Sequence, residues 1–394
     1  MGAPLIPFSA DHEGTWSRTS RTGDSEPRIS DRPLAEPRGP TGTRHVRAGS
    51  RSFRFSVWWS ISGEGQRQRT GANALAAAGP TLVTCTTVPV TTDLRCSSWT
   101  RAHGVDPVGS AGCYAGFLLV ESPPPWPRDI GEIPALHTIA AAAKEAGYRL
   151  QALLPTNPSG TARVIHYRWD PNQGRFVGLE ASGGDDPSAI ALSLLAGSTP
   201  SQSRELAETT DLLICGHGGR DRCCGSLGTV LELEMKRRSL RDVRVWRTSH
   251  TGGHRFAPTG IVFPSGTSWG YLDADALTSI VTRSTPASGY TSRYRGCIGL
   301  ATRGAQAVER AVLAMAGWQV LDWPRRSEEI ADGVVELIAT TPHGERRWRG
   351  KVEVVRTLPV PDCGSRLSGE EKTEDELAVI DLEEQPKIEE AVSQ

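Results

Sequence analysis

The sequence predicts an α/β protein that contains two tandem units of the same element order, a small α+β C-terminal segment and disordered termini. Three observations lead to this prediction. Apolar runs of strand length alternate with helical segments between residues 94 and 363, and the order β-α-β-β-β-α occurs twice. The flanking stretches are instead rich in Arg, Ser, Gly and Pro, or in acidic residues.

The first unit, residues 93–200, is predicted from apolar runs separated by an alanine-rich helix. The run GFLLVE, residues 116–121, has the length and composition of a buried strand, and Gly147 ends the following helix. The predicted elements are a strand at 116–121, a helix at 136–146, strands at 149–154, 162–169 and 176–180, and a helix at 187–195.

The second unit, residues 201–285, repeats this pattern. It begins with the apolar run DLLIC, which ends at Cys215. The predicted elements are a strand at 211–215, a helix at 224–238, strands at 243–248, 260–263 and 269–272, and a helix at 274–283.

The recurrence favours an internal duplication, although alternating strands and helices also occur in α/β proteins without one. The endings of the two units match, with GRFVGLEASGGDDPSAIALSLL in the first and TSWGYLDADALTSIV in the second. A β-α-β sheet extended by an antiparallel hairpin is the thioredoxin-like arrangement. We therefore expect two thioredoxin-like units.

The remaining segments are predicted from composition. Residues 286–363 read as a small α+β segment with a helix at 304–317 and strands at 318–322, 334–340 and 348–355. Residues 364–394 are expected to be a disordered acidic tail, since residues 365–394 hold ten acidic and three basic residues. Residues 1–92 are expected to be a disordered arm, or upstream sequence preceding a natural start near Val90.

Overall composition argues against several classes of function. The net charge of −1 provides no basic field for nucleic acid, and no run of 18 apolar residues could span a membrane. A cytoplasmic location is the default expectation. Arginine supplies 39 of the 44 basic residues, a bias that suggests a GC-rich bacterial genome.

The densest chemical signal is the segment CGHGGRDRCCG, which begins at Cys215, together with HTGGH, which begins at His250. Cys215 ends a predicted strand, and Cys224 begins a predicted helix whose dipole favours a thiolate. The two glycines between His250 and His254 favour a loop after the strand at 243–248. Because both strands end at the same sheet edge, the two Cys and two His side chains are expected to converge.

Two Cys and two His suit either a tetrahedral zinc ion or a 2Fe–2S cluster with two imidazoles on one iron. The eight residues between Cys215 and Cys224 make a wider loop than most zinc knuckles. Cys223 and Cys224 could also form a thiol redox pair, although adjacent cysteines bond only with strain. His217 lies inside the loop and could contact the bound group without ligating it, but a solvated loop histidine is favoured. Cys96, Cys113, Cys297 and Cys363 lack partners at ligand spacing and are assigned no role.

At these residues the chain resembles the sucrase/ferredoxin-like family, a group of thioredoxin-like ferredoxins. The C-x₈-C and HxGGH elements carry the resemblance. Supporting segments are CS at residues 96–97, LLVESPPPWPRD at 118–129, HRFAPTGIVFPSG at 254–266, YRG at 294–296 and VPDCG at 360–364.

The resemblance implies an electron carrier whose 2Fe–2S cluster is held by Cys215, Cys224, His250 and His254. Family spacing favours Cys224 over Cys223 as the second thiolate ligand. Two imidazole ligands imply a potential above that of plant-type ferredoxins and reduction that can couple to proton uptake. The sequence has no nucleotide-binding glycine fingerprint, so an external flavoprotein reductase is the expected donor, with an unknown acceptor. The alternative is a zinc-stabilised Cys₂His₂ binding module. Sucrase activity is not expected, because no motif pairs two carboxylates.

Overall fold

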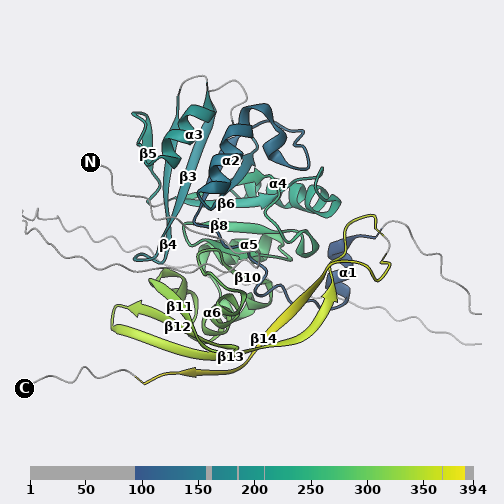
Figure 1. Ribbon diagram of the computed structural model, residues 1–394, viewed down its shortest axis with the longest axis vertical. Helices are drawn as coiled ribbons and strands as arrows, with labels where there is room; N and C mark the ends of the chain where they lie inside the picture. Colours follow the sequence, from purple (N-terminus) through teal and green to yellow (C-terminus); the bar gives the residue numbers. More distant parts are fainter. Residues whose placement is uncertain (1–93, 157–161, 184–185, 208, 366, 387–394) are drawn as a thin grey trace, which may run out of the picture. The chain divides into compact units, whose positions relative to one another are not determined.

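The structure is a computed structural model that describes residues 94–156, 162–183, 186–207, 209–365 and 367–386. The expectations for residues 1–92 lie outside these ranges. The described strands form a ten-stranded sheet, in the order β10-β9-β8-β6-β7-β2-β1-β3-β4-β5, and a four-stranded sheet, β11-β12-β13-β14 (Figure 1). The protein is thus a mixed α/β structure, as predicted.

The first unit has the predicted order of elements. β1 pairs in parallel with β2 and antiparallel with β3, which continues antiparallel to β4. All six residues of β1 are buried, as its apolar sequence predicts. The elements are β1 (Gly116–Glu121), α2 (His137–Glu145), β2 (Tyr148–Leu153), β3 (Arg163–Asp170), β4 (Arg175–Ser182), α3 (Pro187–Leu195) and an added edge strand β5 (Ser203–Glu205).

The second unit repeats these pairings. β6 pairs in parallel with β7 and antiparallel with β8, which pairs with β9. The elements are β6 (Thr210–Cys215), α4 (Thr229–Arg238), β7 (Val243–Thr248), β8 (Gly260–Phe263), β9 (Thr267–Trp269) and α5 (Ala274–Thr282). The predicted strand at 269–272 is therefore shifted, and β9 ends at its first residue.

The two units join edge to edge, where β2 meets β7 antiparallel at Leu153 and Thr248. They also share a core. Side chains of β1 alternate, so that Leu118 packs under α2 and α3 while Phe117 points into a cluster that also contains Leu213 of β6. Within that cluster, the rings of Tyr167 and Phe263 stack with their centroids 4.2 Å apart. Each unit therefore covers one face with its helices and packs the other face against its neighbour.

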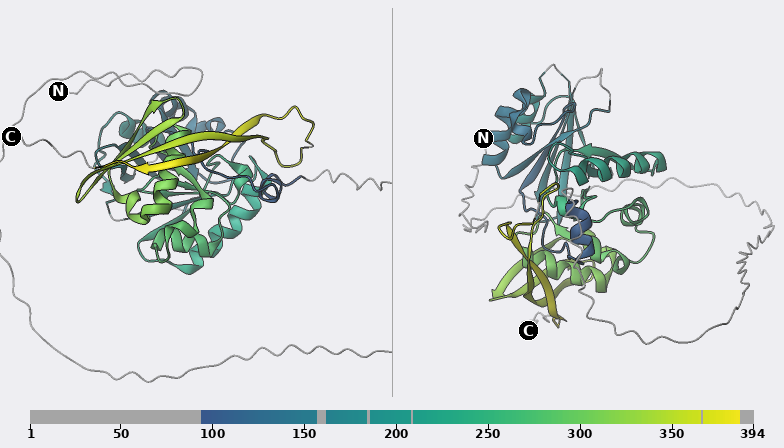
Figure 2. Two further views of the ribbon diagram at one scale, coloured as in Figure 1. Left: turned by 90° about the horizontal axis from the view of Figure 1, so that it is seen from below. Right: turned by 90° about the vertical axis from the view of Figure 1, so that its right-hand side faces the viewer.

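The four-stranded sheet packs against α6 (Arg303–Ala316), which lies next to it in Figures 1 and 2. Its strands are β11 (Arg325–Ala331), β12 (Val334–Thr341), β13 (Gly344–Pro359) and β14 (Thr373–Glu384). The predicted strand at 318–322 is instead a 3₁₀ turn, η7 (Trp318–Asp322), with Val320 and Leu321 buried. A short apolar run does not by itself distinguish a strand from a helical turn.

The expectation of a disordered tail at 364–394 is wrong for residues 373–384, which form β14 along β13. The acidic tail has a basic partner, because β13 contributes the segment GERRWRGKVEVVR. Arg346 contacts Glu384 at 2.7 Å and Arg356 contacts Glu376 at 2.9 Å. Charge composition read along one segment misses such pairing across strands.

The strand β11 was not predicted from the sequence, and neither were two shorter elements. β10 (Tyr294–Cys297) pairs with β9 and ends the large sheet, and α1 (Cys96–Ala102) packs against η4 (His254–Phe256). Both are too short for a hydrophobic period to show in the sequence.

A buried ion pair joins α6 to the four-stranded sheet and supplies a test of this fold. Glu309 Oε1 accepts a 2.6 Å hydrogen bond from Arg325 Nε, and both side chains are fully buried. Glu309 Oε2 also accepts from the Tyr294 hydroxyl and the Cys297 amide. Arg325→Met should lower the free energy of unfolding by about 3–5 kcal/mol, since it leaves Glu309 buried without its charge partner.

Urea denaturation measures this change, and Arg326→Met is the matched control. The Arg326 side chain is 52% exposed and its ion pairs lie at the surface, so its loss should cost about 0–1 kcal/mol. Equal effects of the two substitutions would contradict the structural role assigned to Arg325.

Candidate metal centre

The parallel pairing of β6 and β7 fixes where the site forms. The two strands are in register, so that Cys215 lies opposite Thr248 at their carboxyl ends. The amide of Gly216 donates to the carbonyl of Thr248 at 3.0 Å, and the loops carrying the cysteines and the histidines therefore begin side by side. Both loops thus start at the same sheet edge, as the sequence predicts.

Glycine and aspartate close the cysteine loop. A Cβ added to Gly228 would lie 1.8 Å from the carbonyl oxygen of Cys215, so only glycine allows this approach. Asp221 Oδ1 accepts hydrogen bonds from the amides of Cys223 and Cys224, at 2.8 and 3.1 Å. Cys224 then begins a π-helical turn, η3 (Cys224–Gly228), that leads into α4.

Three of the four expected ligands meet. The Sγ atoms of Cys215 and Cys224 and a ring nitrogen of His250 lie within 4.8 Å of one another. Cys215 Sγ is 3.9 Å from His250 Nδ1, and both cysteines are fully buried. These donors are two thiols and an imidazole, which suit zinc or an iron–sulfur cluster.

His254 lies beside this group, but its ring nitrogens contact other residues. Its ring centroid is 5.9 Å from that of His250. Its Nδ1 is 3.5 Å from Cys96 Sγ and 3.4 Å from Asp221 Oδ2, and its Nε2 is 3.3 Å from Asp362. The structure thus places the fourth expected ligand next to the other three, held by acidic and thiol partners.

The histidine loop is held by the neighbouring unit. Gln151 Nε2, on β2, donates to the carbonyl of His250 at 3.0 Å, and Arg149 donates to the same oxygen. Gly252 and Gly253 adopt positive φ of 85° and 66°, which turns the chain toward His254. The first unit therefore positions a candidate ligand of the second.

His217 is not solvated, contrary to expectation. It is buried, and its Nδ1 accepts from the amide of His250 at 3.2 Å. Its Nε2 lies 3.3 Å from the carbonyl oxygen of Trp126, so this nitrogen carries the proton. His217 thus links the cysteine loop to the histidine loop, a role that a position within a polar loop does not reveal.

Hydrogen bonding shifts the pKa values of the two thiols of the first group, Cys215 and Cys224, in opposite directions. Hydrogen bonds from Cys224 and from His250 hold the pKa of Cys215 well below its usual value, against the effect of burial. The pKa of Cys224 is raised because it donates that hydrogen bond and is buried. Burial lowers the pKa of His250, which keeps its imidazole neutral and able to bind a metal.

A second group of donors lies alongside the first. Single ligand atoms of Cys96, Asp221, Cys223 and Cys363 all lie within 4.8 Å of one another. Cys223 therefore faces this group, whereas Cys224 faces Cys215. Cys96 and Cys363 were assigned no role because both are remote in sequence from the cysteine loop, and only the fold brings them to it.

The pKa values of the second group are shifted in different directions. The hydrogen bond from Cys96 lowers the pKa of Cys223 to about 5, and burial raises the pKa of Cys363 to about 11. Burial opposes ionisation of Asp221, but hydrogen bonds from His254 and the Cys224 amide hold its pKa below the usual range. The other described cysteines lie elsewhere, with Cys113 Sγ 2.9 Å from the carbonyl oxygen of Leu300 and Cys297 Sγ 3.6 Å from that of Ser265.

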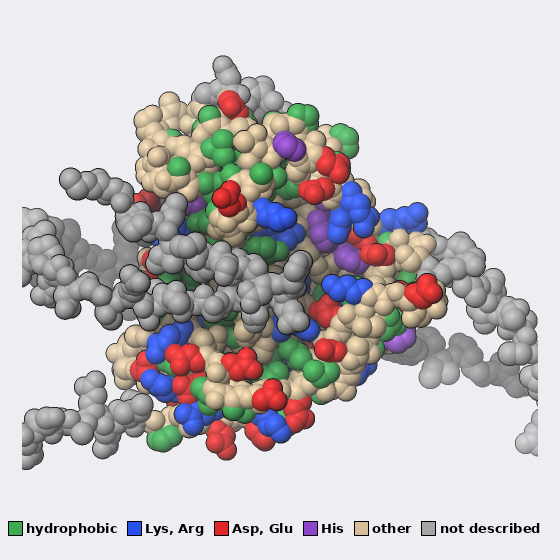
Figure 3. Space-filling view, viewed as in Figure 1, with side chains coloured by type: hydrophobic (Ala, Val, Ile, Leu, Met, Phe, Trp, Pro, Cys, Tyr) green, Lys and Arg blue, Asp and Glu red, His purple; other side chains and the backbone are tan. Residues whose placement is uncertain are grey.

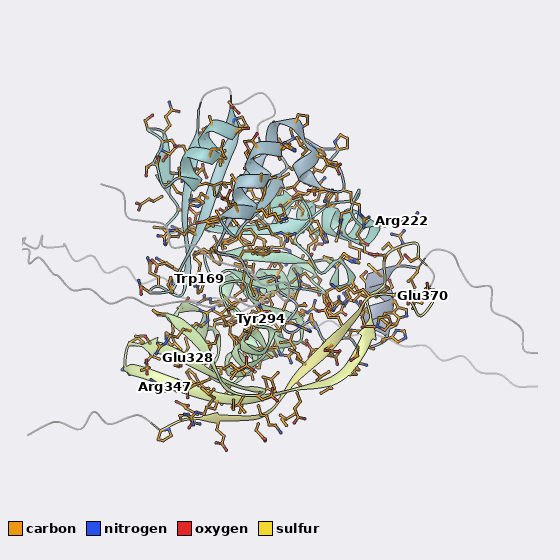
Figure 4. The ribbon with its side chains drawn as sticks, viewed as in Figure 1. Trp169, Arg222, Tyr294, Glu328, Arg347 and Glu370 are labelled. Atoms are coloured by element: carbon orange, nitrogen blue, oxygen red, sulfur yellow. The ribbon has the colours of Figure 1, made fainter. Side chains whose placement is uncertain are left out.

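Charged and histidine side chains lie together on one side of the molecule (Figure 3). On the face shown in Figure 3, histidine side chains gather toward the right-hand side, next to basic and acidic side chains. Figure 4 labels Arg222, from the cysteine loop, on the same side of the molecule as α1 and Glu370. A Cβ added to Gly364 would lie 3.9 Å from Arg222 Cζ, so the segment carrying Cys363 passes close to this loop.

Two yeast proteins named "Altered inheritance of mitochondria protein 32" match over 58 residues, at 36% identity in Meyerozyma guilliermondii and 43% in Debaryomyces hansenii. Each match covers 14% of this chain and 21% of the relative. The bacterial source expected from composition finds no support in these yeast relatives. No solved structure matches the chain.

Among the described residues, no helix is both long and apolar enough to cross a membrane.

Residues 107–296 match the family described as sucrase/ferredoxin-like. This segment includes Cys215, Cys224, His250 and His254 but neither Cys96 nor Cys363. The family name indicated by the cysteine and histidine motifs is therefore supported for residues 107–296.

Proposed function

We propose that this chain is an electron-transfer protein that binds a 2Fe–2S cluster through Cys215, Cys224, His250 and His254. The observation that carries the proposal is the meeting of Cys215, Cys224 and His250 at the shared edge of β6 and β7. When bound, such a cluster accepts and returns a single electron. We further propose that both β-α-β-β-β-α units are thioredoxin-like.

The width of the cysteine loop favours a cluster over a single zinc ion. Eight residues separate Cys215 from Cys224, which makes a wider loop than most zinc knuckles, and a two-iron core needs more room than one ion. His254 would share one iron with His250, and the two ring centroids lie 5.9 Å apart.

The proposed cluster would have a buried cysteine side and a more accessible histidine side. Cys215 and Cys224 are fully buried, so that water is kept from the sulfur ligands. The His254 side chain retains 17% exposure. We infer that electrons enter and leave on the histidine side, exchanged with a separate flavoprotein reductase and an acceptor protein.

The ligand set determines the electrostatics of the site. Two thiolates contribute a charge of −2, whereas neutral imidazoles contribute none. A site with four thiolates would carry a charge more negative by two, and adding an electron there would be harder. The proposed site should therefore have a higher reduction potential than plant-type ferredoxins.

Substitution of the ligands tests the proposal. In protein purified anaerobically, Cys215→Ala, Cys224→Ala, His250→Ala and His254→Ala should each abolish or strongly deplete the visible absorption, the EPR signal after reduction, and the iron and sulfide content. Cys223→Ala should keep all of them, because Cys223 faces the second group. Cys113→Ala is the control at a cysteine outside both groups.

A colourless wild-type protein that contains one zinc ion at these residues would contradict the electron-transfer proposal and favour a zinc-stabilised module. If Cys223→Ala loses the cluster and Cys224→Ala keeps it, the second thiolate ligand is Cys223 and not Cys224.

Gln151 provides a test of the histidine loop. It donates to the carbonyl of His250 and accepts from the Thr248 hydroxyl at 2.9 Å, but it belongs to neither donor group. Gln151→Leu removes these bonds and should speed cluster loss to a chelator, since outer hydrogen bonds typically contribute about 10–100-fold in metal affinity. The decay of visible absorption measures the rate. The control Gln173→Leu, at an exposed position bonded to Asp170, should decay at the wild-type rate, and equal decay in the two variants would argue against this role.

A further inference from the structure

We propose that Cys96, Cys223, Cys363 and Asp221 form a second, structural metal site that binds a zinc ion. The four residues come from three separate segments. Cys96 begins α1, Asp221 and Cys223 lie in the loop after β6, and Cys363 follows β13. Their donor atoms nevertheless lie within 4.8 Å of one another.

Three of the six donor–donor distances are close to those of a tetrahedral site. The Sγ atom of Cys363 lies 3.3 Å from that of Cys223 and 3.5 Å from that of Cys96. Cys96 Sγ lies 3.4 Å from Asp221 Oδ2. Zinc–sulfur bonds of about 2.3 Å place the donors of a tetrahedron about 3.5–3.8 Å apart. A disulfide would need sulfurs about 2.05 Å apart.

Asp221 is oriented for ligation. Its Oδ1 is occupied by the amides of Cys223 and Cys224, so its Oδ2 points at Cys96. Ligand carboxylates are typically fixed in this way by hydrogen bonds to the oxygen that does not bind the metal. The same aspartate therefore shapes the cysteine loop and supplies a donor.

Because these groups are buried, a bound cation would offset the negative charge of their ionised forms. Cys96, Asp221 and Cys223 are buried, and Cys363 is partly buried. Three thiolates and a carboxylate carry a charge of −4, which a divalent cation reduces by half. With four protein donors no coordination position stays open for substrate, which is typical of structural zinc.

The site would tie the start of α1 and the connection between β13 and β14 to the cysteine loop. The amide of Gly364 already donates to the carbonyl of Leu94 at 2.8 Å, next to Cys363 and Cys96. A zinc ion would add a strong cross-link at this point. None of these four residues is an expected cluster ligand, so the proposal does not require the iron–sulfur cluster, but His254 lies 3.5 Å from Cys96 Sγ and 3.4 Å from Asp221 Oδ2 and so adjoins both groups.

Zinc content per chain, measured by mass spectrometry on the full-length protein from zinc-supplemented cells, tests the proposal. Cys363→Ser should remove one zinc ion per chain, both in the wild-type background and in a Cys215→Ser background that disables the first group. Cys113→Ser, the matched control, should not change the zinc content. Iron and sulfide measured on the same samples report on the cluster separately.

Cobalt(II) gives an independent readout. Metal-free wild-type protein titrated with cobalt should develop thiolate-to-cobalt charge-transfer absorption, and Cys96→Ser, which alters a different element, should lose the same part of it as Cys363→Ser. Zinc content unchanged by both substitutions would overturn the proposal. So would a Cys223–Cys363 disulfide without zinc, found by peptide mapping of protein whose thiols were blocked before lysis.

Discussion

The in-register parallel pairing of β6 with β7 is the constraint on which the rest of the site depends. It places the end of one strand, Cys215, beside the end of the other, Thr248, and so starts both functional loops at one edge. Thr248 is also paired with Leu153 of β2, which fixes β7 from its other side. A shift of one residue in either pairing would turn the strand-end side chains to opposite faces of the sheet and separate the donors.

The other end of the same strand pair is anchored by a buried carboxylate. Asp211, near the start of β6, accepts hydrogen bonds from Arg244 and Trp246 of β7, at 2.6 and 2.8 Å. It also accepts from the hydroxyl of Tyr167, in the first unit, at 2.6 Å. Such a satisfied network fixes the register of the two strands and the contact between the two units. The first unit, which carries none of the expected ligands, thus serves as the support of the second.

The C-terminal ribbon brings a remote segment back to this edge. β13 and β14 pair antiparallel along their length, with basic side chains of one strand facing acidic side chains of the other. The connection between them carries Asp362, which contacts His254, and Cys363, which contacts Cys223. The acidic composition that suggested a solvated tail is what allows β14 to pair with the arginines of β13, so the tail prediction failed for an electrostatic reason.

The sequence by itself determined the repeated order of elements, and its motifs predicted four ligands. Strands such as β1 and β6 are short apolar runs with clear ends, and the spacing of Cys215, Cys224, His250 and His254 is local to two loops. Only the tertiary structure decided which neighbours complete the site. Cys96 and Cys363 reach it from segments far apart in the chain, and His217, inside the cysteine loop, accepts a hydrogen bond from the amide of His250. Local spacing and hydrophobic period contain no information about such contacts, because they depend on how the two units and the C-terminal ribbon pack together.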